Sequence, residues 1–87
     1  APQIRPPSEV ITYTLRADRL EKERIPFEAV ADADVRTLYW FVDRRLAGES
    51  RAGELFMWPA VAGDFVVSVI DDHGRAAEAR MGVRLVN

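Results

Sequence analysis

A period of two in the hydrophobic pattern is the feature that most constrains the fold of this chain. In residues 63–70 of the 87-residue sequence, Phe65, Val67 and Val69 alternate with polar Asp64 and Ser68. Successive side chains of a β-strand point to opposite faces of a sheet, so the three apolar side chains share one face. The pattern therefore predicts a strand with one face buried in a core.

The residues that follow predict the second half of a β-hairpin. Asp71-Asp72-His73-Gly74 consists of turn-forming residues, with glycine where a positive φ is least costly. Residues 75–86 then alternate again, with apolar side chains at Ala77, Ala79, Met81, Val83 and Leu85. Alanine and arginine prefer helices, but a period of two over about ten residues outweighs this weak preference. We therefore expect the chain to end in a strand.

Further strands are predicted upstream, because residues 10–15, 25–31, 37–43 and 54–58 are alternating or rich in β-branched and aromatic side chains. Pro26 favours an edge position or a bulge. We expect a turn at Asp43-Arg44-Arg45, a short return strand anchored by Leu46, and a polar loop over residues 48–53. About seven short strands separated by turns indicate an all-β fold, an immunoglobulin-like antiparallel β-sandwich.

Domain organisation follows from the prolines and the length. Pro2, Pro6 and Pro7 favour an extended lead-in, so we interpret residues 1–8 as a Pro-rich linker and residues 9–87 as a single β-sandwich domain. The chain opens on Ala1 in a linker-like stretch and ends on a predicted strand. We therefore expect it to be the last domain of a longer protein.

Strand parity also predicts the structural core. In residues 37–43, Leu38, Trp40 and Val42 share one face, and Phe56 and Trp58 of the later strand could meet Trp40. The predicted core residues are Trp40, Trp58, Phe65, Val67 and Met81. We expect Trp40 to pack between the two sheets, because large aromatic side chains dominate such cores.

The opposite parity predicts an interaction surface. If the strands that carry Trp40, Phe65 and Met81 are neighbours, their outward side chains form one patch, with Glu78 alongside. The predicted patch contains Tyr39, Phe41, Val66, Ile70 and Arg80. A contiguous exposed apolar patch usually marks an interface. The alternatives are that loops of the same domain cover the patch, or that the aromatic side chains merely pair across strands.

The sequence contains no recognisable catalytic or cofactor motif. His73, the only histidine, lies in the predicted turn, and Asp71 and Asp72 lack the spacing of a calcium loop. None of the three serines lies in a nucleophile motif, and the absence of cysteine excludes disulfides and thiolate metal sites. We therefore predict no catalytic residue, no metal and no cofactor, and we expect the domain not to be an enzyme.

Charge and hydropathy exclude further classes of function. A formal net charge of −2 gives none of the basic excess that phosphate backbones require, so nucleic acid is not an expected partner. No apolar run approaches the roughly 18 residues of a membrane-spanning helix. Trp40 and Trp58 could stack on sugar rings, but their parity assigns them to the interior.

Several motifs occur in a fixed order along the chain: Ile4-x-x-Pro7, Leu38-Tyr39-Trp40-Phe41-Val42-Asp43, Trp58-Pro59, Gly63, and Val69-x-Asp71-x-x-Gly74-Arg75. As a set they resemble the C-terminal domain of class A penicillin-binding proteins of the 1C type, over almost the whole chain. Where that family has glycine after the Val-Asp pair, this chain has Arg44, which leaves the turn type at Asp43-Arg44 open.

The resemblance implies a setting in cell-wall synthesis. The parent proteins are membrane-anchored peptidoglycan synthases with glycosyltransferase and transpeptidase domains, on the periplasmic side of the bacterial inner membrane. The transpeptidase Ser-x-x-Lys and Lys-Thr-Gly elements are absent from this sequence, so no family catalytic residue maps onto it. The resemblance therefore implies a non-catalytic accessory domain.

The resemblance leaves the partner open. The candidates are the transpeptidase domain of the parent chain and an envelope protein such as bacterial α2-macroglobulin. The alternative is a carbohydrate-binding module that recognises peptidoglycan glycan through exposed aromatics. We also expect weak self-association through Tyr39 and Phe41 at high concentration, because an uncovered apolar face can pair with its own copy.

Overall fold

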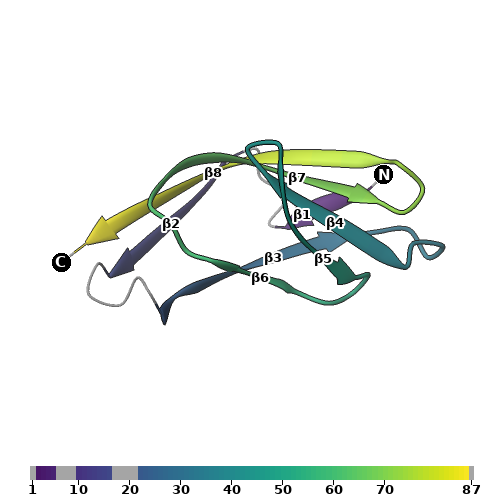
Figure 1. Ribbon diagram of the computed structural model, residues 1–87, viewed down its shortest axis with the longest axis horizontal. Coiled ribbons are helices and arrows are strands. Elements are labelled where there is room, and N and C mark those ends of the chain that lie inside the picture. The colour runs from purple at the N-terminus through teal and green to yellow at the C-terminus, as the bar shows by residue number, and fades with distance from the viewer. Residues whose placement is uncertain (1, 6–9, 17–21, 87) are drawn as a thin grey trace.

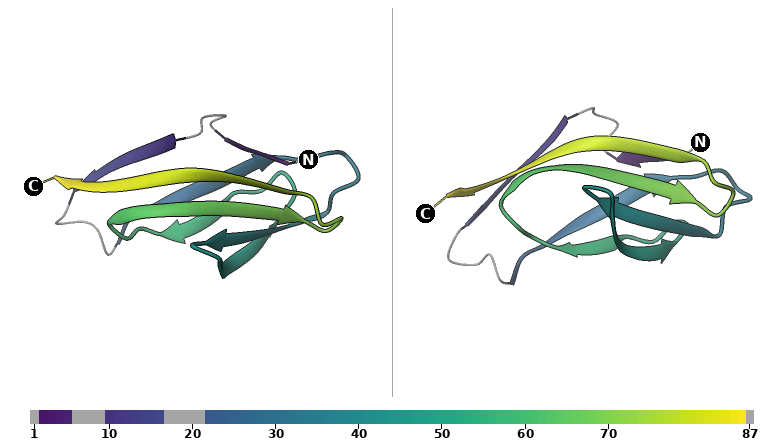
Figure 2. Two further views of the ribbon diagram at one scale, coloured as in Figure 1. Left: turned by 90° about the horizontal axis from the view of Figure 1, so that it is seen from above. Right: turned by 45° about the horizontal axis from the view of Figure 1, so that its top comes forward.

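The computed structural model describes residues 2–5, 10–16 and 22–86, which form two β-sheets packed face to face (Figures 1 and 2). The larger sheet has the strand order β2 (Val10–Arg16), β8 (Ala76–Val86), β7 (Gly63–Asp71), β4 (Thr37–Val42) and β5 (Arg45–Arg51). The smaller sheet has the order β1 (Gln3–Arg5), β3 (Arg24–Val30) and β6 (Phe56–Pro59). These eight strands confirm the predicted all-β sandwich.

The first two strands enter different sheets. β1 pairs antiparallel with β3, with Ile4 opposite Ala29. Residues 3–5 of the predicted linker are therefore a strand, because Gln3, Ile4 and Arg5 lie between the prolines and keep the N–H groups that pairing needs. Ile4 is buried in the core. Positions 1 and 6–8 of the predicted linker lie outside the described residues.

β2 pairs with β8 in parallel, with residues 10–16 beside residues 80–86. This pairing departs from the purely antiparallel arrangement that the turn pattern predicts. A parallel pair cannot be joined by a tight turn, so a period-two pattern with intervening turns does not reveal it. The second strand, β2, therefore lies beside the C-terminal strand β8 at one edge of the larger sheet (Figure 1).

Pro26 lies in β3, the middle strand of the smaller sheet, although proline without an N–H group favours edge strands. The pairing of β3 is divided, however: residues 24–27 pair with β6, and residues 28–30 pair with β1. Pro26 lies opposite Met57 and is exposed. In the described part of the chain, its segment of β3 thus has a partner on one side only, which a residue without an N–H tolerates.

Aromatic side chains from both sheets form the centre of the core. Trp40 is fully buried, and its ring centroid lies 5.4 Å from that of Phe27 and 6.5 Å from that of Phe56. Phe27 also stacks on Trp58 at 5.6 Å, and Trp58 meets Phe65 edge-on at 5.3 Å. The indole Nε1 of Trp40 donates a hydrogen bond to Ser50 Oγ at 3.0 Å. We call these five rings the aromatic column.

The structure places the predicted core residues unequally. Trp40, Val67 and Met81 are buried, whereas Trp58 and Phe65 are only half-buried and pack against the core. The ring that lies between Trp40 and Trp58 is Phe27, a neighbour of both. Trp58 and Phe65 thus pack on the predicted inner side at lower burial, because parity indicates which face a residue occupies but not how far along the sandwich the packing extends.

The β4–β5 hairpin turns through Asp43 and Arg44, which both have positive φ, 49° and 68°. Two consecutive left-handed residues form a type I′ turn, whose twist matches that of paired strands. Asp43 donates its N–H to Val66 O and accepts the Val66 N–H through Oδ1, both at 2.9 Å. These bonds to β7 hold the turn in place although Arg44 occupies a position that favours glycine.

β5 is longer than the sequence predicts, because it includes Gly48 and extends to Arg51. Gly48 lies opposite Trp40, and a Cβ there would come within 2.5 Å of the Phe56 ring. The glycine thus makes room for Phe56 against the strand and does not begin a loop. The predicted loop over residues 48–53 is wrong for residues 48–51, and Leu46, at 64% exposure, is not an anchor.

Replacement of Arg44 by glycine should stabilise the domain. A left-handed conformation costs a residue with a Cβ about 1–2 kcal/mol, and glycine removes most of this strain. We expect Arg44→Gly to raise the melting temperature by about 4–8 °C. In a domain of this size, a gain of about 1 kcal/mol in the free energy of unfolding produces a shift of that order. Circular dichroism melts measure it, with Arg45→Gly, inside β5, as a control that should melt lower. A melting temperature at or below wild type would contradict this account of the turn.

The β7–β8 turn is organised by Asp71, which is buried. Its Oδ1 accepts the N–H groups of His73 and Arg75, both at 2.9 Å, and its Oδ2 accepts Arg75 Nε at 2.9 Å. Arg75 also pairs with Asp32 at 2.7 Å and with Asp34 at 3.2 Å. The Asp-x-x-Gly-Arg motif therefore ties the hairpin of the larger sheet to the β3–β4 connection.

These contacts lower the pKa of two carboxyl groups. Burial of Asp71 raises its pKa, but the N–H groups of Arg75 and His73, together with the Arg75 charge, lower the pKa below the ordinary value of 3.8. The hydrogen bond from Arg75 likewise lowers the pKa of Asp34. A depressed carboxyl pKa contributes stability that is fully present above the unfolded value and is lost as the pH falls through the folded value.

Acid unfolding should therefore depend on Asp71. We expect the melting temperature of the wild-type domain to fall steeply below pH 3.8. Asp71→Asn should be less stable than wild type at neutral pH. Because the asparagine side chain does not titrate, the variant should lose less stability than wild type as the pH falls through the acid range. Thermal melts between about pH 2 and 7 measure this, with the exposed Glu54→Gln as control. Equal slopes for Asp71→Asn and wild type would exclude Asp71 as a source of the acid sensitivity.

Candidate functional site

The outward side chains of the three central strands of the larger sheet form the candidate site. Tyr39 of β4 lies opposite Ile70 of β7, and Phe41 lies opposite Ser68. Val66 of β7 lies opposite Arg80 of β8. Directly opposed residues of paired strands share a face. The structure therefore brings Tyr39, Phe41, Val66, Ile70 and Arg80 together, and we call this set the β4–β7–β8 face.

The apolar side chains of the β4–β7–β8 face remain accessible. Tyr39, Phe41 and Ile70 are of intermediate exposure, and Val66 is 37% exposed. Ser68 lies within the apolar group, with Glu78 beside it on β8. The patch is therefore an apolar band with one internal hydroxyl and charged residues toward β8.

Leu46 joins this face from β5, which the sequence did not predict. A register shift between Trp40 and Phe41 places Gly48 opposite Trp40 and Leu46 opposite Phe41. The extra residue in β5 reverses the parity of the strand, so Leu46 lies on the side of Phe41 and points away from the core. A bulge of this kind leaves no signal in the hydrophobic pattern, so the sequence does not show that Leu46, the predicted anchor of the return strand, points outward.

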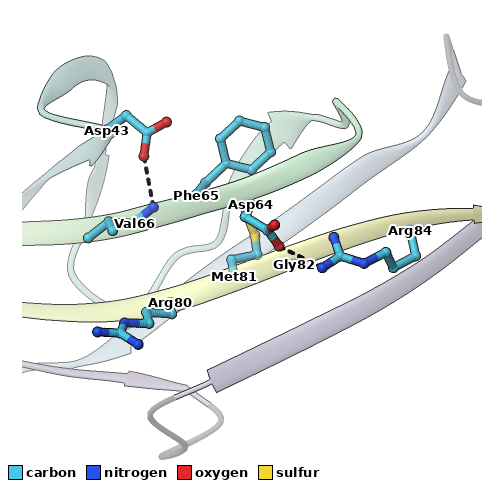
Figure 3. Close-up of a pocket in the computed structure, with 8 residues that line it drawn as sticks. All are labelled: Asp43, Asp64, Phe65, Val66, Arg80, Met81, Gly82 and Arg84. Atoms are coloured by element: carbon cyan, nitrogen blue, oxygen red, sulfur yellow. Dashed lines mark hydrogen bonds and ion pairs between the residues drawn. The ribbon is translucent and has the colours of Figure 1, made fainter.

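Two shallow hollows lie along the face. One, of about 340 Å³, is lined by Ser68, Ile70, Ala76, Ala77 and Glu78. The other, of about 410 Å³, lies over Gly82 and is lined by Val66, Arg80 and the Asp64–Arg84 pair, among others (Figure 3). Both hollows are open, so the face suits an extended or convex partner better than an enclosed small molecule.

The charged groups around the larger hollow differ in their pairing. Arg84 Nη2 lies 2.6 Å from Asp64 Oδ1, an ion pair across the hollow (Figure 3). Asp43 is engaged by the Val66 N–H. Arg80 is exposed and forms no hydrogen bond or ion pair within residues 2–5, 10–16 and 22–86. Arg80 is therefore accessible at the edge of the hollow, as the exposed Glu78 is farther along the same strand.

The remaining polar clusters have structural partners. Asp71 is engaged by the β7–β8 turn and by Arg75, and Ser50 Oγ accepts the Trp40 indole. In the part of the chain that the structure describes, no group of three or more His, Cys, Asp or Glu side chains is placed to hold a metal ion. The same described residues contain no helix long and apolar enough to cross a membrane.

Solved structures with a similar fold confirm the type of sandwich. Fibronectin(III)-like modules of Clostridium thermocellum CbhA superpose with a TM-score of 0.71 at 19% identity, over 100% of both chains. A Bacteroides ovatus protein, SGBP-B of a mixed-linkage glucan utilization locus in complex with a mixed-linkage heptasaccharide, gives a TM-score of 0.59 at 15% identity. That match covers 100% of this chain and 25% of the other. At these identities the likeness shows the fold alone.

The sequence itself gives the family. No curated protein matches the chain. The model of the Penicillin-Binding Protein C-terminus Family matches residues 1–83, which include the strands that carry Tyr39, Asp71 and Arg75. The match covers more than half of the sequence, as the motif set in the sequence predicts. The chain therefore belongs to the penicillin-binding protein C-terminus family.

Proposed function

We propose that this domain is a non-catalytic accessory module of a bifunctional penicillin-binding protein that acts in cell-wall synthesis. In this proposal the parent chain carries glycosyltransferase and transpeptidase domains on the periplasmic side of the bacterial inner membrane. The β4–β7–β8 face docks on the transpeptidase domain of that chain. The observation that carries the proposal is the accessible apolar band of Tyr39, Phe41, Val66 and Ile70 on a domain of this family.

The chemistry of the face supports recognition. The band combines aromatic and aliphatic side chains with charged residues, Glu78 and Arg80, on the adjoining strand. This arrangement is typical of interfaces, which have an apolar centre and a polar rim. The turn carboxylates and Ser50, by contrast, are engaged in structural hydrogen bonds, so they do not supply a poised nucleophile and base.

Linkage in one chain supports the transpeptidase domain as the partner. A tethered neighbour is present at an effective concentration in the millimolar range, so a modest interface is sufficient for docking. Interfaces between domains of one chain bury about 600–1,500 Å² and are more polar than obligate interfaces. A face of half-exposed apolar residues with an internal serine fits that class.

The glycan alternative depends on the same aromatic residues. Tyr39 and Phe41 are accessible on one strand face, where a sugar ring could stack on them. Trp58 is less suited, because its ring stacks with Phe27 and meets Phe65 inside the sandwich. The glucan-binding neighbour shares only the fold. Sugar binding is therefore the alternative that a binding experiment with peptidoglycan must distinguish from docking.

Photocrosslinking in the full-length parent protein tests the proposal. A photoreactive phenylalanine analogue at position 39 should form a crosslink to the transpeptidase domain of the same chain, located by mass spectrometry of the fragments. The same analogue at Met57, which is exposed on the smaller sheet, serves as the matched control and should give no such product.

Binding to purified peptidoglycan sacculi distinguishes the glycan-binding alternative from docking on the transpeptidase domain. Cosedimentation of the wild-type domain that is lost in Tyr39→Ser, with an unchanged melt, would favour the glycan module. Crosslinks from position 39 only to a different envelope protein, or only to a second copy, would also overturn docking on the transpeptidase domain.

A further inference from the structure

We propose that β1 is an exchangeable strand, and that the edge of β3 on which it lies also accepts β1 of a second copy of this chain. In the exchanged dimer, each copy gives its strand Gln3–Arg5 to the smaller sheet of the other. The exchange is independent of the proposed docking function, because it uses the smaller sheet and leaves Tyr39 and Phe41 of the β4–β7–β8 face accessible.

β1 can leave its place without breaking any other strand pair. It is three residues long, and in the described part of the chain it pairs only with β3, over residues 28–30 (Figure 1). β3 also pairs with β6, but over residues 24–27, so that pairing does not depend on β1. β2 follows β1 in the chain and belongs to the larger sheet. A short terminal strand with one neighbour is the kind of element that opens locally while the rest of a domain stays folded.

The burial of β1 shows what this edge of β3 accepts. Pro2 and Ile4 are buried, and Gln3 between them is exposed. Ile4 belongs to the hydrophobic core and lies opposite Ala29, which is also buried. The edge therefore accepts an extended segment with apolar side chains two residues apart. A second copy supplies this same segment, so the exchanged contacts are those of the monomer and the dimer requires no new surface.

The sequence between β1 and β2 favours exchange. Four residues, Pro6-Pro7-Ser8-Glu9, lead from the smaller sheet to the larger one. Each proline fixes φ at about −65°, and consecutive prolines favour an extended backbone over a tight turn. Short, stiff connections promote swapping, because an extended connection leads a terminal strand away from its own domain.

A disulfide between opposed positions of β1 and β3 tests the exchange. Gln3 lies opposite Val30, both are exposed, and the chain has no cysteine of its own. Opposed residues of antiparallel strands have Cα atoms about 4.5–5.5 Å apart, within the range that a disulfide spans. The double variant Gln3→Cys with Val30→Cys is equilibrated in the reduced form at several protein concentrations, then oxidised and separated on a denaturing gel without reductant.

Exchange predicts a covalent dimer in which position 3 of one copy is joined to position 30 of the other. The ratio of covalent dimer to monomer should rise about tenfold for each tenfold rise in monomer concentration, as mass action requires. The matched control is Ser68→Cys with Glu78→Cys, two opposed positions within the β7–β8 hairpin, which should be linked within one chain only. Links only within one chain at every concentration, or equal dimer yields for both pairs, would overturn the exchange.

Sedimentation of the chain without added cysteines provides a second measurement. Insertion of Gly-Gly-Ser between Pro7 and Ser8 lengthens the connection, so β1 returns more easily to its own domain and the dimer should weaken several-fold. Tyr39→Ser should leave the dimer unchanged, because Tyr39 lies on β4 of the larger sheet. A dimer that persists in the lengthened chain but is lost in Tyr39→Ser would overturn the exchange and assign self-association to the β4–β7–β8 face. A wild-type chain that is monomeric at all concentrations would also overturn the exchange, while docking is tested separately by the photocrosslink from position 39.

Discussion

The packing of the aromatic column is the interaction on which the rest of this structure depends. Phe27, Trp40, Phe56, Trp58 and Phe65 come from four strands of two sheets, and successive ring centroids lie 5.3–6.5 Å apart. A domain of 87 residues buries a small core, so a few large rings supply much of its apolar contact. Gly48 is part of the same arrangement, because its missing side chain lets Phe56 lie against β5.

This core also determines which surface is available for binding. β4 gives Leu38 and Trp40 to the interior, and strict alternation then places Tyr39 and Phe41 on the outside. β7 lies between β4 and β8, so its outward Val66 and Ile70 adjoin these aromatics. The candidate surface is thus a consequence of a central strand that is apolar on both faces, which needs a cover on each side. In our proposal the transpeptidase domain is the second cover.

Much of this architecture follows from sequence periodicity, and the exceptions have physical causes. The strands β7 and β8 and the inward side of Trp40 follow from a two-residue repeat, and the turn at Gly74 follows from its turn-forming residues. β1 was not predicted because prolines flank it, and the parallel pairing of β2 leaves no turn signal. The bulge in β5 reversed the parity of Leu46. The ion pair between Arg84 and Asp64 joins residues 20 positions apart, so only the three-dimensional structure reveals it.

The central claim is that the β4–β7–β8 face is covered when the domain is part of its parent protein. Hydroxyl-radical footprinting measures this directly, because it reports the solvent access of individual side chains in the full-length protein and in the isolated domain. The account predicts that oxidation of Tyr39 and Phe41 falls several-fold in the full-length protein, while oxidation of Met57, exposed on the smaller sheet, stays the same. Equal oxidation of Tyr39 and Phe41 in both proteins would contradict it.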